Sequence, residues 1–298
     1  MILINWNSYY HTANCIQSLK QCVGHGFDIL VVDNGSQDGS IQKLKHEFGD
    51  VIYLPFEKNL GFAGGNNRGF EYVLKHDYEY VMMLNNDVFV EPSFMFHLIN
   101  YMVFHPETGA IQPKIFFNDN RLRIWNGGSR YASFFGWAYS RNYMREEGNL
   151  QSIVHEVDWI TGCALLVRTS ILKEIGLLNE NYFIYYEDVD FSFRIKKAGY
   201  SLIFHPDSVI YHIAGMSHKA KSRGPEGYSN PIVHYLNFRN HLWLMRSWNK
   251  WYHWPTTLIT YFTYSLGVMT YFVLRFRRKK LAAVCRGIFD GFFKSYTL

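Results

Sequence analysis

The stretch Tyr80-Val81-Met82-Met83-Leu84-Asn85-Asn86-Asp87 decides the fold. Its apolar first half is typical of a strand that is buried on both faces, as in the middle of a parallel sheet. The strand stops at two amides and a carboxylate, and Glu91-Pro92 then predicts the start of a helix over residues 92–105. Because ligands of open α/β sheets bind beyond the carboxyl ends of the strands, Asn85-Asn86-Asp87 is predicted to face a ligand.

Asp87 has two possible roles at this edge. A lone carboxylate with oxygen-bearing neighbours suits Mg²⁺ or Mn²⁺ shared with the phosphates of a substrate. The same tripeptide is also typical of a polar turn that caps the following helix. Taken alone, the stretch fits both interpretations equally.

Strand and helix patterns alternate through the first third of the chain. Residues 1–5, 27–33 and 51–54 read as earlier strands, with a helix over 12–22. This alternation predicts a doubly wound, mostly parallel α/β sheet. Residues 110–160 then change to short strand-like pieces rich in glycine and aromatic residues, which predicts an insertion of hairpins. Later strands are expected at 156–168, 201–205 and 209–212, and a last helix at 231–248.

Two polar stretches follow the second and third strands. The carboxylate and amides of Asp33-Asn34-Gly35-Ser36 could hold a base or ribose, although a plain turn gives the same string. The stretch from Asn59 to Gly69 contains four glycines and three asparagines, and it precedes a helix expected at 70–76. Glycine lets the backbone approach a ligand closely, and a helix N-terminus attracts phosphate. We therefore favour a ligand-binding loop here over a turn.

A group of carboxylates, Glu187-Asp188-Val189-Asp190, follows an aromatic strand end. They could merely complement the dipole of the helix that starts there, and Asp190 with Arg194 at i,i+4 fits that role. Glu187 and Asp188, however, lie where a catalytic carboxylate could face a cleft. His212 ends a later strand, and a single histidine of this kind is more often structural than a metal ligand.

Composition limits the class of protein. Hydrophobic residues are 48% and charged residues 18% of the chain, which predicts a globular protein. The whole chain has a net charge of +5, but the residues from Arg275 onward carry +6, so the rest must carry −1. A body without excess basic residues argues against nucleic-acid binding. Four cysteines without metal spacing predict reduced thiols in the cytosol, and no signal peptide is expected.

The tail contains an uncharged segment, residues 255–274, that is long enough to span a bilayer. Its threonines, serine and tyrosines make it a poor spanning segment. Tryptophans precede it, and the basic cluster from Arg275 to Lys280 follows it. We predict a helix that lies in or dips into an anionic membrane surface, with the preceding part of the chain on the cytoplasmic side. The alternative is a buried helix of a soluble protein.

Taken together, the motifs resemble the inverting, nucleotide-sugar-dependent glycosyltransferases of family two, within them the bacterial rhamnosyltransferase-like branch. The resemblance covers residues 1 to about 245 and rests on Asn5-Trp6-Asn7, Asp33-Asn34-Gly35-Ser36, Asn59-Leu60-Gly61-Phe62-Ala63-Gly64-Gly65-Asn66, Leu84-Asn85-Asn86-Asp87, Glu187-Asp188-Val189-Asp190-Phe191 and Arg239-Asn240.

The resemblance implies a GT-A fold, a Mg²⁺ or Mn²⁺ cofactor and an inverting transfer. The D-x-D element of the family falls on Asn85-Asn86-Asp87, so only Asp87 matches as a metal ligand. The second metal-side ligand falls on His212 and the catalytic base on Asp188. The usual Asp-Asp pair of the nucleotide loop is Asp33-Asn34 here.

The resemblance also implies the remaining site residues and the domains. Donor-binding residues are expected at Asn5, Asp33, Asn34, Gly61, Gly64, Gly65, Asn66, Asn86 and Asp87. Acceptor-side residues are expected at Trp159, Glu187, Arg239 and Asn240. Residues 1–248 form the expected catalytic domain, with a donor half of about 1–110 and an acceptor half of about 111–248, and residues 249–298 form the helical tail. The expected acceptor is a glycan or a polyprenyl-linked saccharide.

Two other classes remain as alternatives. A sugar-nucleotide pyrophosphorylase would share the sheet and the metal, but it needs a basic glycine-rich loop after the first strand, where this chain has Asn5-Trp6-Asn7-Ser8. A non-catalytic carbohydrate-binding or membrane-scaffold protein could keep the aromatic residues. Retention of Asp87, Asp188 and His212 favours the transferase.

Overall fold

The computed structural model describes residues 1–148, 153–213, 219–224 and 227–294. The chain forms two compact units. The first, here called the sheet unit, comprises Met1–Arg130, Ser140–Phe183 and Asp188–Ala214. The second, the helical unit, comprises Tyr131–Tyr139, Ile184–Glu187 and Gly215–Leu298.

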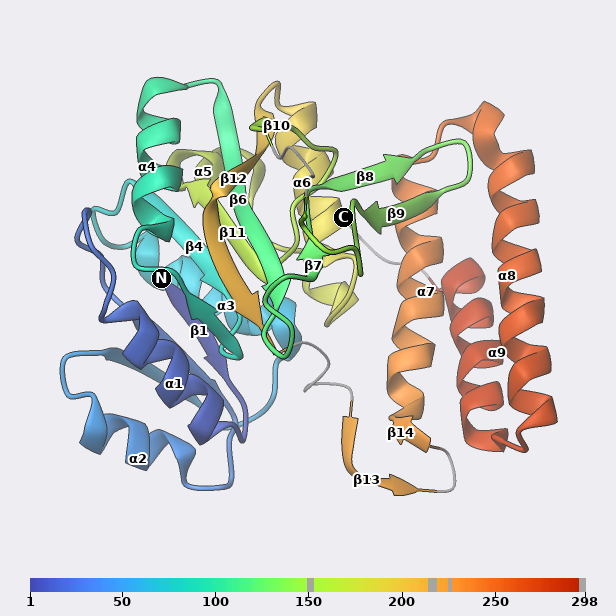
Figure 1. The fold of residues 1–298 in the computed structure, drawn as a ribbon. Helices are drawn as coiled ribbons and strands as arrows, with labels where there is room; N and C mark the ends of the chain where they lie inside the picture. Colours follow the sequence, from blue (N-terminus) through green and yellow to red (C-terminus); the bar gives the residue numbers. More distant parts are fainter. Residues whose placement is uncertain (149–152, 214–218, 225–226, 295–298) are drawn as a thin grey trace. The chain divides into compact units, whose positions relative to one another are not determined.

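The sheet unit is built on one mixed sheet with the strand order β10-β12-β6-β11-β4-β1-β2-β3, in which β5 also pairs with β12 and β7 with β6. Figure 1 labels the strands from β10 to β1 of this order. The strands are β1 (Ile2–Asn5), β2 (Leu30–Asn34), β3 (Ile52–Phe56), β4 (Tyr80–Leu84), β5 (Val88–Val90), β6 (Thr108–Phe117), β7 (Ile124–Asn126), β10 (His155–Glu156), β11 (Ala164–Arg168) and β12 (Ser201–His212). Strands β4, β1, β2 and β3 run parallel, as do β6 and β12, whereas β11 is antiparallel to both of its neighbours. The predicted mostly parallel α/β sheet is confirmed.

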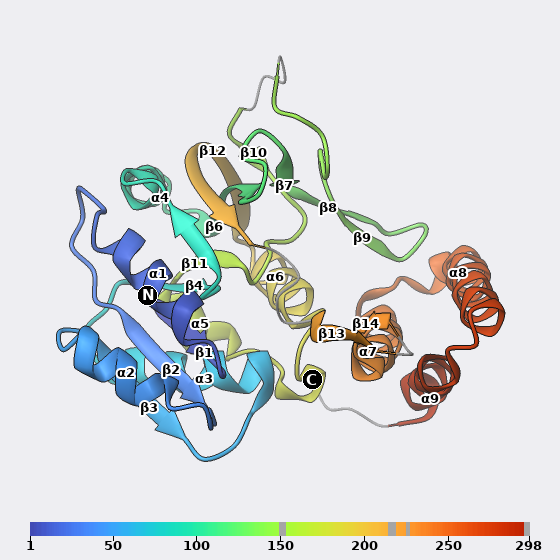
Figure 2. The same ribbon diagram turned by 60° about the horizontal axis from the view of Figure 1, so that its bottom comes forward.

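Helices cover both faces of this sheet, as Figures 1 and 2 show. One layer is α1 (Tyr9–Leu19), α2 (Ser40–Glu47) and α4 (Phe94–Phe104), and the other is α3 (Gly61–Val73), α5 (Thr169–Ile175) and α6 (Glu187–Lys197). Strand β4 supplies both hydrophobic cores, because Met82 and Leu84 face the first layer while Val81 and Met83 face the second. The uninterrupted apolar run of β4 is thus explained by burial on two sides.

Three predicted boundaries were wrong. The strands expected at 201–205 and 209–212 are one strand, β12, whose register shifts between His205 and Val209. In place of the single strand expected at 156–168, the structure has two short strands, β10 and β11, separated by residues 157–163. Helix α3 starts at Gly61, not at residue 70, so the glycine-rich stretch lies inside a helix. The reason is packing: a methyl group at Gly69 would lie 2.6 Å from the side chain of Ile2 on β1.

The helical unit contains α7 (Pro231–Trp248), α8 (Trp254–Leu274) and α9 (Arg278–Phe293), together with β13 (Lys219–Gly224) and β14 (Gly227–Ser229). Its core is formed by Phe238, Leu242, Met245, Tyr261, Phe272 and Val284. Glycines bring α9 against α7, since a methyl group at Gly287 would lie 2.6 Å from the carbonyl oxygen of Tyr235. The catalytic domain was predicted to end at residue 248. In the structure, α7 ends at that residue, and α8 and α9, which follow it, belong to the same compact unit as α7.

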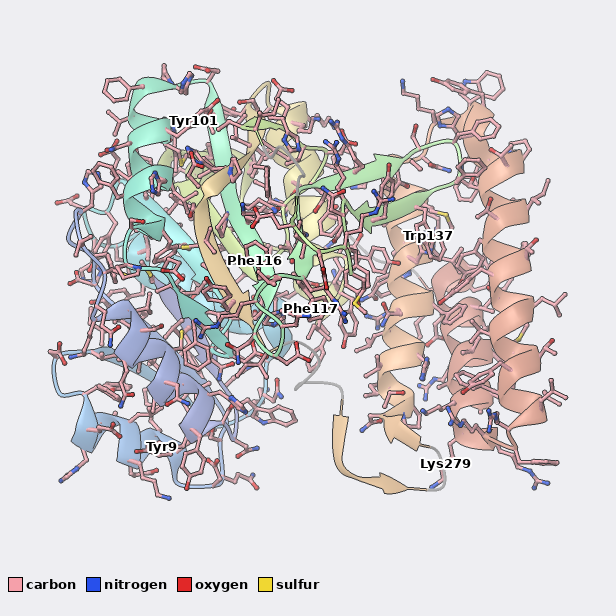
Figure 3. The ribbon with its side chains drawn as sticks, in the orientation of Figure 1. Tyr9, Tyr101, Phe116, Phe117, Trp137 and Lys279 are labelled. Atoms are coloured by element: carbon pink, nitrogen blue, oxygen red, sulfur yellow. The ribbon has the colours of Figure 1, made fainter. Side chains whose placement is uncertain are left out.

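The tip of a hairpin also belongs to the helical unit. Strands β8 (Ser129–Ala132) and β9 (Trp137–Ser140) form this hairpin, in the region where hairpins were predicted. Trp137, labelled in Figure 3, contacts His241 of α7 and Tyr264 of α8 edge to face. Aromatic packing of this kind accounts for part of the high aromatic content of the chain.

Candidate active site

Asp87 and His212 lie side by side at the end of two paired strands. Strand β5 begins directly after Asp87, and its antiparallel register pairs Val88 with His212, the last residue of β12. The backbone N–H of Ile213 donates to the carbonyl oxygen of Asp87 at 2.9 Å. The Nε2 atom of His212 lies 3.1 Å from Oδ1 of Asp87, and their side chains are only 6% and 8% exposed. Backbone pairing thus holds a carboxylate and an imidazole together.

The pair fits a divalent cation. Two ligand atoms about 2.1 Å from one ion, at right angles as in an octahedral site, are about 3.0 Å apart. The Nε2–Oδ1 distance of 3.1 Å agrees with that spacing. Among the described residues, no group of three or more His, Cys, Asp or Glu side chains gathers as a complete metal site. Substrate oxygens and water would have to supply the other ligands, as is usual for Mg²⁺ held against phosphates.

Electrostatics couple the two groups. Burial raises the pKa of Asp87, but the hydrogen bond and the charge of His212 outweigh it, and the net result is a lowered pKa. Burial likewise opposes the charged form of His212, whereas Cys163 and Asp87 favour it and raise its pKa to about 10. A metal ion would take the place of the proton that this pair otherwise shares.

Asp188 lies at the start of α6 in a different environment. Its Oδ2 accepts a hydrogen bond from the backbone N–H of Gly162, and its Oδ1 accepts one from that of Val189, each at 2.9 Å. Burial raises the pKa of Asp188, and these backbone bonds only partly offset the effect. Because both of these donors are backbone N–H groups and not cations, the carboxylate keeps a raised affinity for a proton, which suits a general base.

One short segment connects the two carboxylates. Gly162 donates its N–H to Asp188, and the next residue, Cys163, accepts a hydrogen bond from the N–H of Asn85 at 2.9 Å. A side chain at Gly162 would lie 2.9 Å from the ring of Phe62, which explains the small residue there. The fold therefore brings the ends of β4 and the start of α6 to the same edge of the sheet.

A buried network of side chains joins the first two strand ends. Nδ2 of Asn5 donates to Oδ1 of Asp33 at 2.8 Å, and Oδ1 of Asn5 accepts from the hydroxyl of Thr12 at 2.8 Å. Nδ2 of Asn86 in turn donates to the Thr12 hydroxyl oxygen at 2.8 Å. The structure thus brings Asn5, Asp33 and Asn86 together. Thr12 is the link that sequence reasoning missed, because one threonine in a helix carries no recognisable signal.

Asn34 and Asn66 engage in internal hydrogen bonds. Nδ2 of Asn34 donates to Asn59 and to the carbonyl oxygen of Gly61, while its Oδ1 accepts the N–H of Leu60. Nδ2 of the buried Asn66 donates to the carbonyl oxygen of Phe62 within α3. These two side chains shape the turn into α3, and their contact with a donor stays a prediction.

The glycines at the start of α3 permit close packing. Gly61 has φ +77°, and a methyl group there would lie 2.5 Å from Phe183. Methyl groups would lie 2.9 Å from Leu60 at Gly64 and 3.1 Å from Ile4 at Gly65. The N–H groups of Gly61 and Ala63 already donate to Asn59 and Phe183. Two N–H groups at the start of α3 are thus satisfied internally, and phosphate binding by these glycines stays a prediction.

The residues predicted on the acceptor side fall into both units. Nε1 of Trp159 donates to the carbonyl oxygen of Arg130 in the sheet unit. Glu187, Arg239 and Asn240 belong to the helical unit, and Glu187 is buried. Arg239 stacks on Trp243, with 4.1 Å between the guanidinium carbon and the ring centre.

Trp125 of β7 contacts the Asp87–His212 pair. It packs edge to face against the ring of His212, with 4.6 Å between ring centres, and sequence reasoning gave it no role.

Asp190 of α6 forms an ion pair with Arg194 at 3.1 Å. Arg194 also donates to the carbonyl oxygens of Ile175 and Leu177. This ion pair supports the structural role considered for Asp190.

The chain is similar in sequence to known glycosyl transferases. The family model described as "Glycosyl transferase family 2" matches residues 1–176. A protein of Mycobacterium tuberculosis, named N-acetylglucosaminyl-diphospho-decaprenol L-rhamnosyltransferase, is 26% identical over 310 residues, which cover 95% of this chain and 97% of that protein.

Two solved structures share the fold. GalNAc-T7 with UDP, GalNAc and Mn²⁺ gives a TM-score of 0.66 at 14% identity, over 98% of this chain and 55% of that chain. The mannosyltransferase PcManGT from Pyrobaculum calidifontis, in complex with GDP-Man and Mn²⁺, gives 0.57 at 13% identity, over 99% of this chain and 87% of that chain. These structural matches show the GT-A fold of the chain; at such low sequence identity they show the fold alone.

Proposed function

Because this chain belongs to glycosyl transferase family 2, we propose that it moves a sugar from a nucleoside-diphosphate donor to a hydroxyl group with inversion of the anomeric centre. The observation that carries the proposal is the pair of carboxylates in opposite environments, Asp87 against His212 and Asp188 against backbone N–H groups. Family membership supports sugar transfer in the synthesis of cell-surface glycans, and the proposal adds the roles of the residues.

Asp87 and His212 would hold Mg²⁺ or Mn²⁺. The ion supplies charge that stabilises the departing nucleoside diphosphate. Mn²⁺ in the two solved structures with this fold supports a divalent cation here. Asn85 replaces the first carboxylate of the family motif, and its Nδ2 lies 3.4 Å from Nε2 of His212. With one carboxylate instead of two, metal affinity depends more strongly on the imidazole.

Asp188 would take the proton from the acceptor hydroxyl as that oxygen attacks the anomeric carbon. Its raised pKa makes it a stronger base than an ordinary aspartate. Attack from the face opposite the leaving group inverts the centre without a covalent enzyme intermediate. A second nucleophilic carboxylate is therefore unnecessary.

The donor and acceptor are proposed from the relative that spans nearly the whole chain. That relative is named for L-rhamnose transfer to a decaprenol-linked N-acetylglucosamine. We propose rhamnose as the sugar and a lipid-linked saccharide as the acceptor. A diphosphate-linked lipid acceptor would also explain why a transferase carries an apolar helical tail.

Helix α8 supports attachment to a membrane. Among the described residues, one segment, Trp251–Leu274, is long and apolar enough to cross a bilayer. Its buried positions are Thr257, Tyr261, Ser265 and Phe272. Its exposed face is more apolar than its buried face, with Ile259 at 67% and Leu266 at 63% exposed. A helix in water shows the reverse pattern, so this face fits lipid.

The basic cluster next to α8 supports an anionic surface as the partner. Arg275, Arg278 and Lys279 are exposed, and Figure 3 labels Lys279 at the start of α9. Lys280 was assigned to the same cluster from the sequence, and that assignment was wrong. It is 1% exposed and donates to Ser229, because α9 turns this position into the helical unit. We propose peripheral attachment on the cytoplasmic side through the exposed basic residues.

Membrane attachment is tested by fractionation of two charge-reversed proteins. Arg278→Glu/Lys279→Glu should move protein into the soluble fraction, since each basic residue near an anionic surface contributes about 1 kcal/mol. The control, Lys43→Glu/Lys45→Glu on the exposed side of α2, should fractionate as wild type. Wild-type protein found wholly in the soluble fraction at low salt would contradict the attachment.

The transfer itself is tested with a panel of nucleotide sugars. Slow hydrolysis of one donor, abolished by a chelator and restored by Mg²⁺ or Mn²⁺, is the expected result. Addition of a polyprenyl-linked saccharide should accelerate release of the nucleoside diphosphate. Release of pyrophosphate from a nucleoside triphosphate would instead support the pyrophosphorylase, and inertness toward every donor would support a binding protein.

A further inference from the structure

A strained segment immediately precedes Asp188 in the chain. Phe183, Tyr185 and Tyr186 have φ angles of 66°, 75° and 71°, in the left-handed region that residues other than glycine rarely adopt. Three such residues within four positions persist only where surrounding contacts hold them. We call residues 183–186 the aromatic strap.

Helix α7 supplies contacts that hold the strap. The fully buried Asn240 donates from Nδ2 to the carbonyl oxygens of Ile184 and Tyr185, both at 2.9 Å. The ring of His241 lies parallel to that of Tyr186, with 5.2 Å between centres and 5° between planes. His241 is itself held by a hydrogen bond to the carbonyl oxygen of Gly136. Two consecutive residues of α7 thus fix three consecutive residues of the strap.

The strap leads directly into the proposed base. Its first residue is tied into the sheet unit, since the carbonyl oxygen of Phe183 accepts the N–H of Ala63 at 3.1 Å. Asp188 follows Tyr186 by two residues and lies in the first turn of α6. The backbone path between Phe183 and Asp188 therefore depends on whether Tyr185 and Tyr186 keep their left-handed conformations.

We propose that Asn240 and His241 are positioning residues for Asp188, which they orient through the backbone of the aromatic strap. The proposal rests on the proposed function, in which Asp188 is the base. It gives Asn240 a role other than the acceptor contact predicted from the sequence. A residue that acts on Asp188 alone should affect the chemical step and leave donor binding unchanged.

The test compares two identical substitutions in one helix. Asn240→Asp keeps the shape of the side chain, removes both N–H donors and turns an oxygen toward two carbonyls. The control is Asn237→Asp, because Nδ2 of Asn237 also donates to a backbone carbonyl, but that carbonyl belongs to Val233 of α7 itself and not to the strap. We expect Asn240→Asp to lower kcat of transfer by about 100-fold, the scale of a misplaced catalytic group, with the KM for donor unchanged. Asn237→Asp should lower kcat by less than about threefold.

Each result decides the question. Equal losses in the two variants, or a rise in donor KM that matches the loss in kcat, would overturn the positioning role. If Asn240→Asp does not fold, His241→Ala and His241→Phe replace it: only Ala removes the ring stacked on Tyr186, so only Ala should lose kcat. Equal behaviour of that pair would also overturn the proposal. An active wild type with an unaffected Asn240→Asp contradicts the positioning role alone, whereas a wild type inert toward all nucleotide sugars contradicts the proposed function as well.

Discussion

Asp87 and Asp188 are carboxylates at one edge of one sheet, yet their surroundings differ in kind. Asp87 faces an imidazole at 3.1 Å, and its pKa is lowered despite burial. Asp188 accepts hydrogen bonds from two backbone N–H groups, and burial raises its pKa. Environments that separate the pKa values of two carboxylates assign them different chemistry. Asp87 is suited to remain charged beside a cation, and Asp188 is suited to exchange a proton.

Removal of the Asp87 carboxylate should have the largest effect. Asp87→Ala leaves His212 without its partner and removes the carboxylate ligand, so donor turnover should be abolished. Excess chelator on the wild type should give the same result. Asp119→Ala, at an exposed carboxylate, is the control and should be active. Full activity of the wild type in excess chelator would show that Asp87 does not serve a metal.

A smaller loss should follow removal of the proton acceptor. Asp188→Asn keeps the shape of the side chain but accepts no proton, so transfer should fall by about two to four decades. Donor affinity, measured by calorimetry, should persist. Glu187→Gln is the comparison that sharpens the assignment. If it causes the greater loss, the neighbouring carboxylate is the base.

The raised pKa of Asp188 predicts the pH dependence of transfer. Asp188 is active only when deprotonated, and its pKa lies above the ordinary 3.8 of an aspartate. Activity should therefore be lost as the pH falls through this raised pKa, at a higher pH than for an unperturbed carboxyl group. The measurement is kcat against pH at saturating metal and donor. An acid limb at or below pH 3.8 would contradict the difference between the two carboxylates.

The smallest effect is expected at Thr12, whose hydroxyl accepts a hydrogen bond from Asn86, the residue before Asp87. Thr12→Val removes the hydroxyl between Asn5 and Asn86. The buried Asn5 amide oxygen loses its donor and the half-buried Asn86 amide loses its acceptor, which should cost about 1–3 kcal/mol of unfolding free energy. Thermal unfolding measures this loss. Because Asn86 adjoins Asp87, donor KM should rise while kcat changes little. Unchanged stability would mean that water replaces the hydroxyl.

Sequence reasoning recovered the sheet because β4 is apolar on both faces and stops sharply at Asn85. Ordered motifs predicted roles for Asp87, Asp188 and His212, and the structure brings Asp87 and His212 into contact. The roles themselves stay predictions. Sequence reasoning misplaced the start of α3 within the stretch from Asn59 to Gly69, and it did not foresee the close packing there, since glycine allows close packing and close ligand approach equally. The left-handed Tyr185 and Tyr186 left no trace in the sequence, because tyrosine gives no sign of such a conformation.

Gly69 of α3 and Ile2 of β1 have a consequence for how this protein can diverge. The methyl group absent from Gly69 would lie 2.6 Å from Ile2, a side chain with no exposed surface. Neither position can grow alone, since the space for one is occupied by the other. Across homologues the two should covary in volume, with a larger residue at 69 accepted only alongside a smaller one at 2. A lineage that exchanges them must pass through an intermediate with either a clash or a cavity in its core.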